Sequence, residues 1–466
     1  MKRLQRSLRW LYPGMLVKRW AALVVVGMGL FLFGMTVRLQ APTPEAWFIG
    51  NLSAKVGLFY TFSGIKALQF GLVLSVLGVM LCLFAFLRMI LSLIQAIDPE
   101  RKGKSDLADV IYQRRILAHG KRIVVIGGGT GLSTLLRGLK QYTSNITAIV
   151  TVADDGGSSG KIVKQLNMLP PGDIRNCLVA LADDETQMTE LFQYRFGKSV
   201  YPEGELALAK AGAAGGVGVA ENPEQAMSYG EGLRDHAFGN LLIAAMCAIN
   251  RGDFQKAIRE TSRVLNVRGR VLPSTVEHIQ LKAEMEDGTF VEGETNIASV
   301  RKKIKRMMTV PENPLPADEV VEAIETADVI VLGPGSVFTS IIPNLLVKGI
   351  PEAIRRSKAR KLYVCNVMTQ RGETEGYSVF EHINALERHA TQRIFDYVIV
   401  NTGVPAPEVL ERYRKSGVDL VENDIDRVRA AGYRPLQGNF VNQSDIVRHN
   451  SEVLARTIIQ LQTNKR

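Results

Sequence analysis

An α/β fold with a doubly wound, mostly parallel, Rossmann-like sheet is predicted for the larger part of this 466-residue chain. Short apolar runs typical of buried strands recur along residues 121–466, mostly separated by helical stretches. The glycine-rich segment Gly127–Gly131 lies between one such run and a helical segment, where folds of this class bind phosphate. Two long apolar segments near the N-terminus predict two transmembrane helices before the sheet.

The two N-terminal segments are long enough to cross a bilayer. Trp20–Val37 and Ala67–Leu87 contain no charged side chain, and about 20 apolar residues span the hydrocarbon core. A cleaved signal peptide and a buried core helix are alternatives, but the first segment is long and has a poor cleavage site. We therefore expect a membrane anchor and linker over 1–105, with helices at about 20–37 and 67–87, and a cytoplasmic domain over 106–466.

Charges around the apolar segments predict their orientation. Residues 1–19 carry six basic side chains and no acidic one, and more basic residues follow Leu87. Positively charged flanks remain on the cytoplasmic side of a membrane. We therefore expect a multi-pass protein of the cell (inner) membrane with both termini in the cytoplasm. The four cysteines have no C-x-x-C spacing, which agrees with a reducing compartment and gives no zinc motif.

The net charge of +11 would ordinarily suggest a nucleic-acid partner. Much of the surplus lies beside the apolar segments, where anionic lipid headgroups are its natural partner. No aromatic and basic pattern of an RNA-binding module is present, and the run Arg301–Arg306 is interpreted as a solvated helix face rather than a binding patch. We therefore expect no nucleic acid among the partners.

The cytoplasmic part is expected to contain five parallel strands, a hairpin and an insert. A hairpin on an Asp-Gly turn, His278–Gly293, predicts a small β excursion. The glycine- and alanine-rich stretch 197–232 is difficult to pack into a core, so we interpret it as a mobile insert, with a lid over the site as the alternative. The expected strands are Ile123–Ile126, Thr147–Val152, Val329–Leu332, Leu362–Val367 and Tyr397–Val400.

The first glycine-rich loop is a candidate phosphate site. Backbone N–H groups without a neighbouring Cβ let an anion approach, and the helix that follows presents its positive end. The spacing differs from the dinucleotide fingerprint, whose third glycine would fall at Leu132. A tight turn without a ligand is therefore the alternative. The candidate ligand-binding residues here are Gly127, Gly128, Gly129, Thr130 and Gly131.

The loop after the strand ending at Val152 is rich in carboxylates and hydroxyls. Its candidate residues are Asp154, Asp155, Gly156, Ser158 and Ser159. Adjacent carboxylates can bind Mg²⁺, accept hydrogen bonds from ribose hydroxyls, or cap a helix. Asp154 and Asp155 are accordingly the candidates for a Mg²⁺ site and for catalysis, although no cofactor is certain.

A third segment combines a rigid backbone with charged side chains. Consecutive prolines fix the chain, and the residues after them are Asp173, Arg175 and Asn176. This set suits the positioning of an anionic ligand. The alternative is that Asp173 and Arg175 pair with each other and cap the following helix.

A second glycine-rich loop follows a buried run and repeats the pattern of the first. Two such loops at one sheet edge fit a diphosphate or two separated anionic groups. The candidates in this loop and in two further segments are Gly333, Pro334, Gly335, Ser336, Asn240, Asn366 and Thr369. The absence of a Walker A lysine argues against ATP hydrolysis.

The chain contains five motifs in the order Ile126–Ser133, Thr151–Gly160, Leu169–Leu178, Gly333–Ser336 and Asn366–Gln370. Together they closely resemble the gluconeogenesis factor (YvcK type) branch of the CofD, or 2-phospho-L-lactate transferase, superfamily. The resemblance covers about residues 121–455. The N-terminal hairpin, the 197–232 insert and Asp235, where the family commonly has glycine, depart from the pattern.

This resemblance implies a Rossmann-like fold that binds a nucleotide sugar such as UDP-N-acetylglucosamine, with a role in carbon metabolism, cell shape and envelope synthesis. The transferase relatives join a phospholactyl group to a deazaflavin with Mg²⁺. Two functions therefore compete: a membrane-tethered regulator that binds a UDP-sugar, and a Mg²⁺-dependent phosphoryl-linked transferase. The regulator is preferred, because a soluble cofactor pathway needs no membrane anchor. The sequence does not identify the protein partner, and it is compatible with a homo-oligomer.

Overall fold

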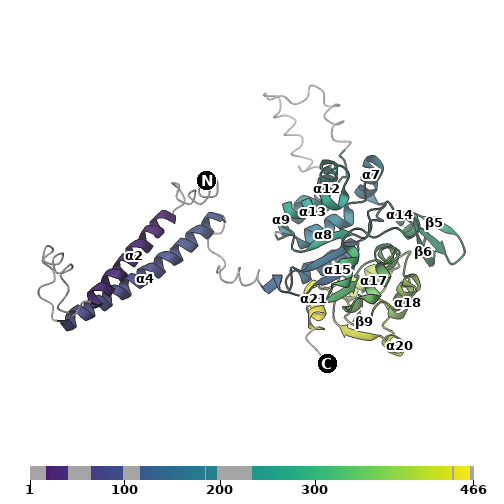
Figure 1. Ribbon diagram of the computed structural model, residues 1–466. Helices are drawn as coiled ribbons and strands as arrows, with labels where there is room; N and C mark the ends of the chain where they lie inside the picture. The colour runs from purple at the N-terminus through teal and green to yellow at the C-terminus, as the bar shows by residue number, and fades with distance from the viewer. Residues whose placement is uncertain are drawn as a thin grey trace, which may run out of the picture. The chain divides into compact units, whose positions relative to one another are not determined.

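The computed structural model describes residues 17–39, 64–97, 116–183, 185–196, 233–442 and 446–461 (Figure 1). The insert expected at 197–232 and most of the linker before the domain lie outside the described residues. The chain divides into two compact units, Met1–Val110 and Ile111–Arg466.

The N-terminal unit is a pair of long apolar helices, α2 (Val17–Leu39) and α4 (Gly64–Ile97). Both are long and apolar enough to span a membrane, which confirms the two apolar N-terminal helices. Glycines allow their backbones to approach closely. A Cβ at Gly34 would lie 2.6 Å from the backbone N of Ser75, and one at Gly78 would lie 2.6 Å from the carbonyl O of Gly27. Such small-residue contacts are typical of helix pairs in membranes.

The C-terminal unit is built on a seven-stranded sheet with the order β10-β9-β8-β7-β1-β2-β3. Every neighbouring pair is parallel, which confirms the predicted fold class. The chain adds β2 on one side of β1 and later places β7 on the other, so the sheet reverses its order of growth beside β1. The strands are β1 (Ile123–Gly127), β2 (Ile146–Val150), β3 (Arg270–Pro273), β7 (Val329–Leu332), β8 (Arg360–Val364), β9 (Tyr397–Asn401) and β10 (Arg434–Gly438).

Helices cover both faces of this sheet, and a core lies on each. Side chains alternate along β1, so that Val124 and Ile126 enter one core while Ile123 and Val125 enter the other. The first core contains residues of α15 (Val320–Glu325), the π-helix η2 (Val337–Ile341), α16 (Ile342–Leu345), α17 (Ile350–Arg356), α18 (Val379–Ala390) and α20 (Ile425–Ala430). The second contains residues of α6 (Gly129–Leu139), α7 (Gly157–Leu166), α8 (Gly172–Leu181), α9 (Glu185–Gln193), α12 (Phe238–Ile249), α13 (Phe254–Val264) and α21 (Ser451–Gln460).

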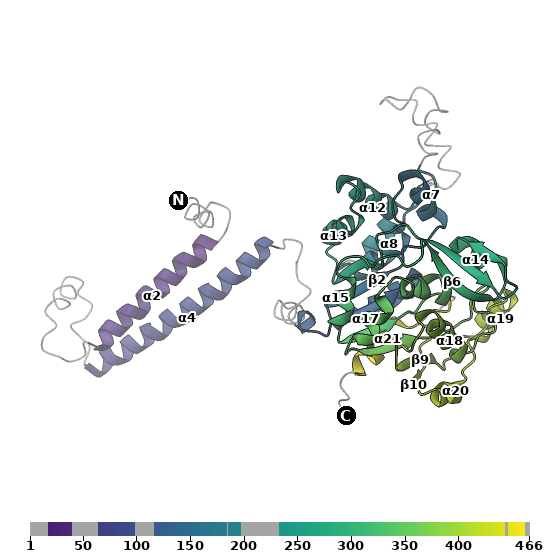
Figure 2. The same ribbon diagram turned by 45° about the vertical axis from the view of Figure 1, so that its right-hand side comes forward.

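The predicted β excursion is a small antiparallel sheet of β4 (Gln280–Met285), β5 (Phe290–Glu292) and β6 (Ile304–Val310). Helix α14 (Glu294–Val300) connects β5 to β6. Figure 2 shows this sheet at the side of the domain, near α18, where the Met307 amide donates a 2.8 Å hydrogen bond to His389 Nε2.

The basic run Arg301–Arg306 was expected on a helix, and this expectation is wrong. Its second half lies on β6. Lys302 pairs with Asp287 at 2.6 Å and Lys305 with Glu284 at 2.5 Å. Acidic residues in and beside β4 therefore neutralise part of the charge of this basic run. Charge density alone does not distinguish a helix from a strand, because both can present such side chains to water.

Candidate functional site

The two glycine-rich loops leave adjacent strands and lie against each other. β1 and β7 pair in parallel, and Gly333 N–H donates to the carbonyl of Ile126 at 2.8 Å. A Cβ at Gly131 would lie only 2.6 Å from the carbonyl O of Pro334. The loops therefore need a residue without a side chain at Gly131, and they form one surface at the point where the sheet reverses. Ligands of open α/β sheets bind at this point.

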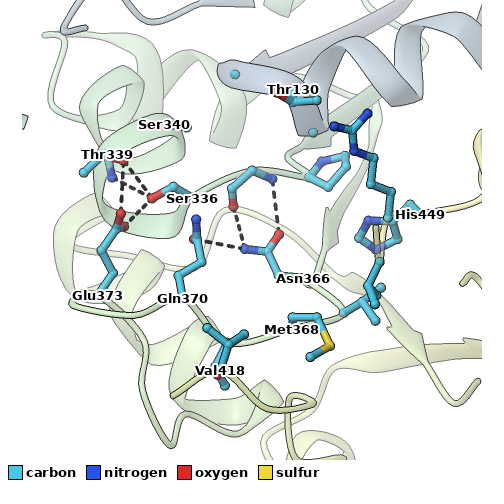
Figure 3. A pocket seen from close by; sticks show the side chains of 18 of the residues that line it. Thr130, Ser336, Thr339, Ser340, Asn366, Met368, Gln370, Glu373, Val418 and His449 are labelled. Atoms are coloured by element: carbon cyan, nitrogen blue, oxygen red, sulfur yellow. Dashed lines mark hydrogen bonds between the residues drawn. The ribbon is translucent and has the colours of Figure 1, made fainter. Parts of the chain in front are cut away.

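This surface lines a cavity of about 620 Å³, which we call the main cavity (Figure 3). One part is polar and includes both loops, Ser336 and Asn366, whereas Val367, Met368 and Val418 supply an apolar part. Such a cavity suits a ligand with an anionic portion and a ring. Its remaining lining comes from Thr134, Thr339, Ser340, Thr369, Gln370, Arg371, Glu373, Tyr413, Val447, Arg448, His449 and Glu294.

The start of α6 forms part of the wall of the main cavity. Gly128 is extended and provides no capping side chain, and the helix begins at Gly129 with a φ of +66°. The carboxylate of Asp173 accepts a hydrogen bond from the Gly129 amide. Thr130 and Gly131 also belong to the first turn and line the cavity, and amides of a first helical turn have no partner within their own helix.

Three carboxylates interact beside these loops. Burial, followed by the charge of Asp154, raises the pKa of Asp173 to about 6. Burial, followed by the charges of Asp154 and Asp173, raises the pKa of Glu294 to about 8. Glu294 is therefore mostly protonated at pH 7. Across the described residues, no group of three or more His, Cys, Asp or Glu side chains is arranged as a metal site.

The two adjacent aspartates have different partners. Asp154 Oδ1 accepts from the Gly156 amide at 3.0 Å. Asp155 Oδ1 accepts from the amide and the hydroxyl of Thr295, at 3.0 and 2.7 Å, in the first turn of α14. Asp155 thus contacts the first turn of a helix that is distant in the sequence, whereas the N-cap residues of α7 and α14 are Gly156 and Gly293. Both aspartates line a separate cavity of about 350 Å³.

Four of the predicted side chains are buried in the fold around the site. Asn240 Nδ2 donates to Ser158 Oγ at 3.0 Å, which joins α12 to α7. Ser159 is also buried. Thr369 lines the main cavity, but its hydroxyl donates to the Asp419 carbonyl and accepts from the Asp419 amide.

The other predicted residues fall into three groups. Gly127 and Gly333 belong to the strand ends beneath the loops and do not line the main cavity, whereas Pro334 and Gly335 do. Arg175 and Asn176 line a separate, smaller pocket.

Several residues that line the main cavity do not belong to any of the five sequence motifs. Glu294, Arg448 and His449 come from segments far from the glycine loops. Glu373 lies behind Ser336, whose hydroxyl donates to its carboxylate, and burial raises the pKa of Glu373. A glutamate next to a turn or an arginine before a helix is too common a pattern to identify such residues.

Comparisons with known proteins agree with this architecture. Residues 123–441 match the family described as 2-phospho-L-lactate transferase CofD. The gluconeogenesis factor of Bacillus subtilis is 42% identical over 73% of this chain and 98% of its own length. A Nostoc sp. protein is 40% identical over 98% of this chain and 93% of its own. A crystal structure of a UPF0052 family member from Bacillus halodurans, 45% identical, covers 73% of this chain and 99% of its own, with a TM-score of 0.64.

Proposed function

Since this chain belongs to the CofD family and is related to the gluconeogenesis factors, we propose that it is a membrane-tethered regulator that binds a nucleotide sugar of the UDP-N-acetylglucosamine type. The observation that carries the proposal is the contact between the two glycine loops on the wall of a 620 Å³ cavity. A volume of this size lies within the range for small-molecule sites. Occupancy of the cavity would link carbon supply to cell shape and envelope synthesis.

The proposed ligand lies along the cavity from its polar to its apolar part. Its diphosphate faces the first turn of α6 and the Arg448 side chain, which lines the same cavity. Its base packs on Met368 and Val418. Asn366 acts through the second glycine loop, because its Nδ2 donates to the Gly335 carbonyl at 2.9 Å and its Oδ1 accepts from the Gly335 amide at 3.3 Å.

Calorimetry with UDP-N-acetylglucosamine, followed by mass spectrometry of the recovered ligand, tests this function. We expect saturable binding and chemically unchanged ligand. UDP and N-acetylglucosamine 1-phosphate, measured separately, show which half of the ligand contributes the affinity. The absence of saturable binding by all three compounds would contradict the proposal.

A Mg²⁺-dependent transferase is the second candidate. The supporting observation is that the charges of Asp154 and Asp173 raise the pKa of Glu294 beside the glycine loops, because neighbouring carboxylates attract a divalent cation. Such a site would need a rearrangement of these side chains, since the described residues contain no group of three that is arranged to hold a metal. Mg²⁺ there would stabilise charge during transfer of a phosphoryl-linked group. Incubation with a phospholactyl donor, a deazaflavin and Mg²⁺ distinguishes the candidates, because only a transferase forms a product detectable by mass spectrometry.

Glu294 should make nucleotide-sugar binding depend on pH when Mg²⁺ is absent. Its pKa of about 8 means that it is mostly neutral at pH 7 and becomes charged by pH 9, where it repels a diphosphate. We expect the affinity to fall severalfold over this interval, and Glu294→Gln to remove most of the fall. Calorimetry at both pH values measures the effect. An equally steep decrease in the Glu294→Gln variant would assign the pH dependence to another group.

Removal of residues 1–105 should move the protein from the membrane fraction to the soluble fraction. The apolar helices lie within the first compact unit, and the second unit begins only at Ile111. We expect the 106–466 fragment to retain helical circular dichroism and the ligand affinity of the full chain. Cell fractionation, followed by calorimetry, tests both expectations. A fragment that still sediments with membranes would contradict the proposed tether.

A further inference from the structure

A second pocket lies on the other side of Thr130 and is lined by arginines. Its volume is about 280 Å³, and it shares Thr130 and Arg448 with the main cavity. Arg137, Arg175 and Arg195 supply most of its charge, and none of the described residues that line it is acidic. We call it the arginine pocket. Its excess positive charge is the observation that needs an explanation.

The carboxylates among the described residues balance this charge only in part. Glu185 accepts from Arg137 Nε, but it also accepts from Lys140 Nζ at 2.7 Å, so two cations share one carboxylate. Arg195 donates to the uncharged carbonyl of Asp235 at 2.8 Å. Among the described residues, the cations around this pocket therefore outnumber the carboxylates that they contact.

Arg175 is held in place by packing rather than by an ion pair. A Cβ at Gly239 of α12 would lie 2.7 Å from Arg175 Cδ, so this glycine makes room for the arginine stem. Its Nη2 donates to Asn176 Oδ1 at 3.0 Å, while its buried Nε has no hydrogen-bond partner among the described residues. Burial, followed by repulsion from the Arg195 guanidinium, lowers the pKa of Arg175, and the charges of Asp154 and Asp173 oppose this shift. A bound anion would reduce the repulsion between Arg175 and Arg195 and would accept a hydrogen bond from the unpaired Arg175 Nε.

We propose that the arginine pocket binds a second, small, phosphate-bearing molecule while the main cavity holds its own ligand. Guanidinium groups recognise phosphate oxygens through paired hydrogen bonds, and several around one pocket favour a multiply charged anion. The pocket is smaller than the usual range for drug-sized ligands, which restricts its ligand to a few heavy atoms besides the phosphate. Because Thr130 and Arg448 line both compartments, each ligand should change the affinity of the other.

Pyrophosphate is the first probe, titrated into the full chain in detergent and in buffer without phosphate or sulfate. We expect saturable binding that Arg175→Gln and Arg195→Gln weaken by about tenfold or more, since each removes a charge-assisted contact. Arg195 is exposed and should be replaceable without loss of folding. The matched control is Arg263→Gln, an exposed arginine of α13 that pairs with Glu260 and should leave pyrophosphate affinity unchanged.

A second titration separates the two compartments. We expect Asn366→Ala, in the main cavity, to retain pyrophosphate binding, and wild-type protein saturated with UDP-N-acetylglucosamine to bind pyrophosphate still. Unchanged pyrophosphate affinity in both arginine variants would overturn the proposal. Simple competition between the two ligands would also overturn it, because the anion would then occupy the main cavity. If UDP-N-acetylglucosamine fails to bind, the proposed function fails, while the pyrophosphate titration of the arginine variants still tests this pocket.

Discussion

Gly129→Val should reduce nucleotide-sugar affinity by about a hundredfold or more. Gly129 has a φ of +66°, a backbone conformation that a β-branched residue avoids, so the substitution should shift the first turn of α6. The amides of Thr130 and Gly131 would then lose their alignment with the diphosphate. Loss of two charge-assisted hydrogen bonds, each worth about 1.5–3 kcal/mol, gives an effect of this size. Calorimetry with UDP-N-acetylglucosamine measures it.

Gly288→Val is the matched control for backbone strain. Gly288 has a φ of +82° in the turn between β4 and β5, and nothing lies within 4 Å of the position that its Cβ would take. This variant should lose stability but keep its affinity for the nucleotide sugar. Unchanged affinity in Gly129→Val would place the ligand elsewhere in the protein.

Gly138→Ala should lower the free energy of unfolding of the C-terminal unit by about 2–3 kcal/mol. A glycine-to-alanine substitution inside a helix ordinarily stabilises the helix by about 0.5–1 kcal/mol. At Gly138 we expect the substitution to destabilise the unit instead. The reason is the contact of α6 with α21, where a Cβ at Gly138 would lie 2.0 Å from the carbonyl O of Ser451 and 2.9 Å from the Cβ of Ala455. Chemical denaturation of the 106–466 fragment measures the change.

Adding Ala455→Gly to this variant tests the explanation. It should restore only part of the stability, because it removes the contact with the Ala455 side chain but leaves that with the Ser451 carbonyl. Since Arg448 lies shortly before α21, a displaced α21 should also weaken ligand binding in Gly138→Ala. A stability equal to or above that of the wild type would show that α21 does not pack on α6 in solution.

The apolar runs along the chain predicted the parallel sheet because strands buried on both faces are continuously apolar. Strand ends were less well defined. Thr147–Val152 was expected, whereas β2 is Ile146–Val150, since a buried loop can be as apolar as the strand before it. The two N-terminal helices were identified for a similar reason, because membrane-spanning length and the absence of charge are properties of the sequence itself.

By itself, the sequence determined that the two glycine-rich loops would lie at one edge of the sheet, because the carboxyl ends of parallel strands share that edge. Their contact depends on the pairing of β1 with β7, which only the folded sheet decides. Only the tertiary structure decided which polar side chains face the loops. Asp154 and Asp155 are adjacent in sequence, yet Asp155 is held by Thr295 of α14. Arg448 reaches the site from the far end of the chain. Contacts between distant segments depend on how helices and loops pack, and a local pattern of residue types does not encode that packing.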